Sequence, residues 1–238
     1  MKKYCLLVIC LGAVFNALAT QNTTEELVSL KEKIDRAVVK FEHTEREQWS
    51  YTVSRYEDEE GDITSSIEQY SPQSSERWLL KQINGQQPTT KQIKTYAKKK
   101  NKQSNKTKQG NNIQLSLREL INQQSLSLLS NDDKYIVMAF DVDWRKLGKD
   151  SIGKLQGKLT YQKEKQFIEK ISIWNNAEFS PMFTAKITDL AVTFTFLQIN
   201  EAVLSKQYEM KMKGSFAYFT EINETSLDSF SDYLYKAE

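Results

Sequence analysis

The chain has 238 residues, of which 27% are charged and 39% are hydrophobic, a composition typical of a globular protein rather than a disordered or membrane-spanning one. Its 33 basic and 31 acidic side chains nearly balance, which argues against a protein built as a whole to bind nucleic acid. It has two cysteines and one histidine, so clustered-histidine zinc sites are excluded.

The first 19 residues have the three parts of a cleavable export signal. Met1-Lys2-Lys3 is positively charged, residues 4–15 are apolar, and Ala17-Leu18-Ala19 matches an A-x-A cleavage site. The apolar run is short for a membrane span. We therefore expect cleavage and export to the periplasm, and the alternative is an uncleaved N-terminal anchor. Both cysteines leave with the signal, so the mature chain would have no disulfide, thiol nucleophile or thiolate metal site.

The segment that follows the signal predicts one helix and three strands. Apolar residues recur at helical spacing from Thr24 to about Phe41, which predicts an amphipathic helix. The pattern then alternates with period two, which predicts strands from Trp49, over 63–70 and over 77–83. An acidic turn at 57–62 separates the first two of these strands, and Asn84-Gly85 marks the turn after the third.

The middle of the chain predicts two helices around a lysine-rich insert. Pro88 with Thr89 and Thr90 opens a helix that continues to about Lys100. Residues 98–112 are rich in Lys, Asn and Gln and are expected to be the least structured stretch. A short helix is expected within residues 115–129.

Strands dominate from Lys134 to the end of the chain, with apolar residues on one face and polar residues on the other. This alternation is typical of an antiparallel sheet with one buried and one solvated face. Residues 20–238 are therefore expected to form one α+β, mainly β, domain. Its core would be a curved antiparallel sheet, or incomplete β-barrel, of about 8–11 strands with a few covering helices.

Large apolar side chains on the strand faces are either core or the lining of a cavity for an acyl chain, where methionine adapts to variable shapes. The two interpretations differ in whether the helices fill the inner side of the sheet completely. The candidate cavity residues are Trp49, Tyr51, Trp78, Met138, Phe140, Trp144, Val192, Phe194, Phe196, Met210 and Met212.

The lysine-rich segment has no acidic residue from Lys91 to Lys108. Such a run is either a solvated, mobile segment or a docking site for an anionic membrane surface or headgroup. The candidate docking residues are Lys98, Lys99, Lys100 and Lys102.

Several short motifs resemble the LolA-like superfamily of periplasmic lipoprotein carriers, in particular a branch of outer-membrane lipoprotein-sorting proteins. The resemblance covers roughly residues 45–235. The motifs that carry it are Tyr70-Ser71-Pro72, Glu76-Arg77-Trp78-Leu79-Leu80, Ile83-Asn84-Gly85, Pro88-Thr89, Phe179-Ser180-Pro181-Met182-Phe183, Phe194-Thr195-Phe196, Gly214-Ser215-Phe216 and Ser231-Asp232-Tyr233.

The resemblance implies an incomplete antiparallel barrel with helices as a lid over a hydrophobic cavity. It also implies carriage of lipoproteins, uptake of lipids or sensing of envelope stress, and Arg55 and Arg77 are stand-ins for the arginine that carriers use in cargo handling. We expect a non-catalytic binding protein for a lipid or acylated lipoprotein, with no cofactor, no metal and no nucleic acid. Transient contact with a membrane surface or an envelope protein is also expected.

Two alternatives stay open at this point. One is an envelope scaffold or stress sensor with a filled core and a protein partner. The other, an enzyme, is the least favoured, because the carboxylates of Asp141 and Asp143 have no histidine or cysteine partner nearby in the sequence.

Overall fold

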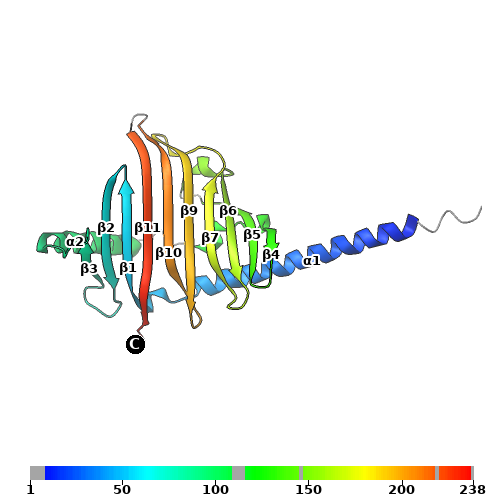
Figure 1. The fold of residues 1–238 in the computed structure, drawn as a ribbon, viewed down its shortest axis with the longest axis horizontal. Helices are drawn as coiled ribbons and strands as arrows, with labels where there is room; N and C mark the ends of the chain where they lie inside the picture. Colours follow the sequence, from blue (N-terminus) through cyan, green and yellow to red (C-terminus); the bar gives the residue numbers. More distant parts are fainter. Residues whose placement is uncertain (1–8, 109–115, 145–146, 218–219, 237–238) are drawn as a thin grey trace, which may run out of the picture.

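The computed structural model describes residues 9–108, 116–144, 147–217 and 220–236. Within these residues it has three α-helices and one antiparallel sheet of eleven strands (Figure 1). The helices are α1 (Ile9–Glu42), α2 (Thr90–Lys108) and α3 (Leu117–Leu120). The strands are β1 (Trp49–Glu59), β2 (Asp62–Tyr70), β3 (Trp78–Ile83), β4 (Ser127–Asn131), β5 (Tyr135–Asp141), β6 (Leu155–Gln162), β7 (Phe167–Asn175), β8 (Phe179–Met182), β9 (Ala185–Ile199), β10 (Ala202–Phe216) and β11 (Thr220–Tyr235).

The sheet is open, and its strand order is β3-β2-β1-β11-β10-β9-β7-β6-β5-β4, with β8 paired to β9 beside this path. Most neighbours follow one another in the chain, whereas β1 pairs with β11 across nearly the whole sequence. The predicted fold class, a mainly β protein with a curved antiparallel sheet of about 8–11 strands and few helices, is therefore confirmed.

Helices α1 and α2 lie on the same face of the sheet, which we call the inner face (Figure 1). Helix α1 packs against β7 and β10, and α2 packs against β3. The apolar stripe of α1, with Ile34 and Val38 fully buried, covers the inner side chains of β5, β6, β7 and β9. Burial of this stripe follows from its helical spacing, because residues three and four apart share one face of a helix.

The structure differs from the sequence-based expectation at three element boundaries. Helix α1 begins at Ile9 rather than near Thr24, so the predicted cleavage position after Ala19 lies within it, and cleavage stays a prediction. Helix α2 continues to Lys108 through much of the segment expected to lack structure. The short helix expected within residues 115–129 is present as α3, but it ends at Leu120 and is followed by a short 3-10 turn and strand β4, which pairs with β5.

Strand β11 was not identified from the sequence, although it lies near the middle of the sheet. Its inner positions include Glu224, Ser226 and Asp228, so it lacks the apolar alternation that marks the other strands. Among the described residues, none of the helices combines the length and the apolar character needed to cross a membrane.

Candidate functional site

The half of the inner face beneath α1 is a filled core. The ring of Phe41 in α1 lies edge-on against that of Phe196 in β9, with 4.9 Å between the ring centroids. Met138 and Phe140 of β5 are also buried there, together with Val192 and Phe194. Of the eleven candidate cavity residues, these five form one packed core beneath the helix.

Three further candidates, Trp144, Met210 and Met212, are half-buried and pack against the edge of this core. Trp144 follows β5, whereas the two methionines alternate along β10. Trp49, Tyr51 and Trp78 lie elsewhere, on β1 and β3, with the ring of Tyr51 centred 5.9 Å from that of Trp78. The predicted cavity residues therefore lie at both ends of the inner face, with Met210 and Met212 between them.

A row of aromatic rings crosses the inner face and connects these two ends. The ring of Tyr208 in β10 lies 5.1 Å from that of Phe194 and 5.1 Å from that of Phe230 in β11. The ring of Phe230 in turn lies 5.8 Å from that of Tyr51, which is edge-on to the ring of Trp78. The crossed arrangements, with interplanar angles of 61–84°, are those that aromatic side chains prefer.

Between the region packed under α1 and the region packed under α2 lies a set of half-buried side chains that we call the central strip. It consists of Tyr208, Met210 and Met212 on β10 and Asp228 and Phe230 on β11. These residues share the inner face because Tyr208 is paired with Asp228 in the sheet register. Ser226 and Glu224 are paired with Met210 and Met212 on the same face, so the strip places adaptable apolar side chains beside two carboxylates, Glu224 and Asp228.

The carboxylate of Asp228 belongs to an ionic cluster, the Arg55 cluster, formed by Arg55, Glu68, Tyr96, Lys100 and Asp228. The Arg55 guanidinium donates to Asp228 through Nη1, and its Nε lies 3.2 Å from Oε1 of Glu68. Lys100 Nζ of α2 lies 2.8 Å from Oε2 of Glu68, and the Tyr96 hydroxyl donates to the same oxygen at 3.0 Å. The cluster thus fastens α2 to β1, β2 and β11.

The environment shifts the pKa values of the cluster in different directions. Burial works to raise the pKa of Glu68, but the hydrogen bond from Lys100 and the charge of Arg55 outweigh it and hold that pKa below 4.5. Burial raises the pKa of Asp228 despite the attraction of Arg55. Burial also lowers the pKa of Lys100, whose ammonium group lies 4.1 Å from the ring centroid of Trp78.

The predicted docking lysines have different surroundings. Lys100 is held by Glu68 and packs over Trp78, whereas Lys98 and Lys99 are exposed on α2. The side chain of Lys102 lies outside the described residues. Of the two stand-in arginines, Arg55 lies in the ionic cluster and Arg77 is exposed just before β3.

Sequence reasoning missed Glu68, Tyr96 and Asp228. A signal for part of the cluster was present in β1, where Tyr51, Val53 and Arg55 occupy successive inner positions. A charged residue that continues an apolar face must find a partner or remain solvated, because an unpaired buried charge is costly. Asp228 could not be identified as a partner because β11 was not identified as a strand, and no local pattern pairs Arg55 with Glu68 on the predicted strand over 63–70.

Comparisons with known proteins add little to this geometry. No family model matches the chain, and no curated protein matches it significantly. Its structure is distantly similar to the crystal structure of a DUF1329 family protein from Desulfovibrio piger, with 8% sequence identity and a TM-score of 0.33 over 84% of this chain and 90% of that one. A likeness at this level carries no argument about function.

Proposed function

We propose that the protein is a non-catalytic, exported binding protein of the cell envelope that holds the acyl part of a lipid or lipoprotein on its central strip. The observation that carries the proposal is the position of Met210 and Met212. Both are half-buried beside the filled core and lie on the same inner face as the Arg55 cluster. An apolar surface that adjoins paired charges suits a ligand with an acyl chain and a polar headgroup.

The chemistry of the central strip supports an acyl chain as its occupant. Methionine side chains adapt to irregular apolar shapes, and aromatic rings provide broad contact surfaces. Each CH₂ group that such a chain buries would contribute about 0.8 kcal/mol. The charges of the Arg55 cluster offer both a cation and an anion to a zwitterionic or hydrogen-bonding headgroup. The periplasm as the site of action rests on the signal predicted from residues 1–19.

The first test is native mass spectrometry of protein purified from the periplasm without detergent, followed by extraction with organic solvent. We expect an extra mass that extracts as an acylated molecule. Protein that stays unliganded, even after incubation with phospholipid and lipoprotein, would contradict the proposal. A phospholipid in the extract would identify a lipid as the cargo, whereas an acylated peptide would identify a lipoprotein.

The second test places the cargo on the central strip. The double substitution Met210→Asp and Met212→Asp should abolish ligand retention, because it introduces two charges into the apolar part of the strip. The matched control, Lys211→Asp with Lys213→Asp, introduces the same side chains at exposed positions of the same strand. Circular dichroism should show both proteins folded, and Met210→Ala with Met212→Ala provides a milder variant. Equal retention by the methionine and lysine variants would refute the assignment.

The alternative, an envelope scaffold or sensor with a protein partner, is favoured by a different observation. Phe41 and its neighbours in α1 fill the inner face over β5 to β9, so that region leaves no room for a ligand. The same mass measurement separates the two functions, since a scaffold with a filled core would be purified without lipid.

A further inference from the structure

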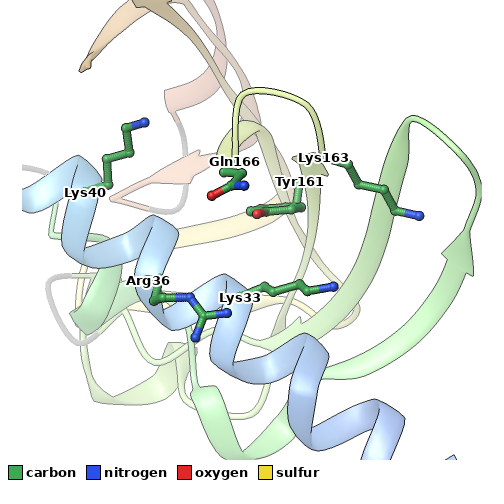
Figure 2. Close-up of a pocket in the computed structure, with 6 residues that line it drawn as sticks. All are labelled: Lys33, Arg36, Lys40, Tyr161, Lys163 and Gln166. Atoms are coloured by element: carbon green, nitrogen blue, oxygen red, sulfur yellow. The ribbon is translucent and has the colours of Figure 1, made fainter. Parts of the chain in front are cut away.

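A second site lies beside α1, where the helix passes the turn between β6 and β7. A pocket of about 330 Å³ there is lined by Lys33, Arg36, Lys40, Tyr161, Lys163 and Gln166 (Figure 2). Four of these six side chains are cations, and none of the six is a carboxylate. The central strip shares no residue with this pocket.

The helix contributes its three cations from one side. Lys33, Arg36 and Lys40 are spaced by three and four residues and so lie along one side of the helix, from which their side chains diverge around the pocket, as Figure 2 shows. Like charges at this spacing repel one another and weaken a helix. Lys163 adds a fourth positive charge to the same pocket. Repulsion among these four cations favours the binding of an anion between them.

The carboxylates near these cations compete only weakly for them. Arg36 is 3.9 Å from Glu32, and the two side chains are 68% and 64% exposed. Lys40 is 2.8 Å from Glu201, and the side chains are 24% exposed for Lys40 and 89% exposed for Glu201. The Glu32–Arg36 pair is exposed on both sides, and such pairs contribute little to stability. In the second pair the carboxylate of Glu201 is exposed, so an incoming anion can compete with it for Lys40.

The turn between β6 and β7 is held by hydrogen bonds that leave the positive charge of Lys163 without a carboxylate partner in the described part of the chain. Lys163 donates through Nζ to the backbone carbonyl of Asp132. Among the residues that the structure describes, Lys33 and Lys163 form no ion pair. The buried side chain of Gln162 accepts a hydrogen bond at 2.6 Å from the backbone N–H of Lys165 and so fixes the turn.

Two neutral groups complete the pocket. Gln166 has a φ of 56°, a left-handed conformation that a residue with a side chain rarely adopts. The phenol of Tyr161 is largely buried, and burial raises its pKa despite the nearby charge of Arg36, so it remains a hydrogen-bond donor at neutral pH. A cavity with four cations and neutral donors matches a multiply charged anion with several acceptor oxygens.

We propose that this pocket binds a phosphate group carried by a small organic molecule or by a lipid headgroup. Its volume lies at the small end of the range for ligand pockets and exceeds what a bare phosphate needs, which leaves room for an organic substituent. Arginine at position 36 can make paired hydrogen bonds to phosphate oxygens, and the lysines supply further charge. The site stands independently of the acyl-binding proposal.

The test is calorimetric titration of the purified protein with glycerol phosphate in a buffer free of phosphate and sulfate. The double variant Lys33→Gln with Arg36→Gln should weaken binding by about tenfold or more, because it removes two charge-assisted contacts. The matched control, Lys158→Gln with Lys170→Gln, removes two exposed cations on other parts of β6 and β7 and should change the affinity by less than about twofold.

A second variant leaves the net charge unchanged. Tyr161→Phe removes a donor from the pocket and keeps the ring, so it should weaken binding by about fivefold, as expected for one neutral hydrogen bond. Circular dichroism and the melting temperature establish that each variant is folded.

Vesicles separate the two sources of phosphate. Binding to phosphatidylglycerol vesicles with the same sensitivity to the pocket variants, without binding of glycerol phosphate, would assign the site to a lipid headgroup. Binding of glycerol phosphate in solution would assign it to a small phosphate ester. Equal weakening by the pocket and control pairs would show a general charge effect and overturn the proposal, as would a lack of binding to both probes.

Discussion

Substitution of Glu68 by glutamine tests the reasoning on the Arg55 cluster most directly. The Glu68 side chain is 7% exposed. It forms ion pairs with Arg55 and Lys100 and accepts a hydrogen bond from the Tyr96 hydroxyl. Removal of one partner from a buried ion pair costs about 3–5 kcal/mol. We expect the lower end, a loss of about 3 kcal/mol in the free energy of unfolding, because Arg55 keeps Asp228 and Lys100 can turn toward solvent.

Urea denaturation at pH 7, followed by tryptophan fluorescence, measures this loss. The matched control is Glu178→Gln, which removes the carboxylate from an exposed ion pair with Lys186 and should cost less than about 0.5 kcal/mol. A value for Glu68→Gln below about 1 kcal/mol would refute the view that this cluster holds α2 on the sheet.

The dependence on pH gives a second readout of the same variant. Because the folded-state pKa of Glu68 lies below its ordinary value of 4.5, its contribution is present above that value and is lost as the pH falls through the folded-state pKa. Asp228 acts in the opposite sense, since its pKa is raised and its protonation favours the folded state. The difference between the wild type and Glu68→Gln should therefore shrink below about pH 4.5. A constant difference down to pH 3 would contradict this assignment.

Further predictions concern the core. Phe41→Ala should lower the free energy of unfolding by about 3–5 kcal/mol, because Phe41 is buried against Phe196; a change under about 1 kcal/mol in urea would contradict the packing of α1. Gly157→Ala should cost about 1–3 kcal/mol, since its Cβ would lie 2.3 Å from the ring of Phe140. Lys158→Ala, at the exposed neighbouring position, serves as the control and should leave the melting temperature nearly unchanged.

The sheet could be predicted from the sequence wherever the apolar alternation is strong. The strands that contain Met138, Phe194 and Met210 have one clearly apolar face, and they are all present. The first helix was identified from the spacing of Leu30, Ile34 and Phe41, all of which are buried. The start of this helix was not identified, because the apolar residues of the predicted signal favour a helical conformation as strongly as the segment that follows them.

The candidate site could be predicted only in part, because it depends on which strands become neighbours. Met210 and Met212 were identified as candidates, since both lie on an apolar strand face. The partners of Arg55 come from β2, β11 and α2, and no local pattern brings Glu68 and Asp228 together. The pocket beside α1 was missed for the same reason, since Lys163 and Gln166 meet the helix only in the folded chain.

The position of β11 between β1 and β10 has a consequence for how the molecule folds. The Tyr235 hydroxyl donates to Gln48, a residue 187 positions earlier in the chain. Pairing across such a separation is slow, because the loop must close before the contacts form. Until β11 arrives, β1 and β10 each have an unpaired edge that another chain could join. Pairing of β11 therefore joins the β1 side of the sheet to the β10 side and ends the interval in which these two edges are exposed to aggregation.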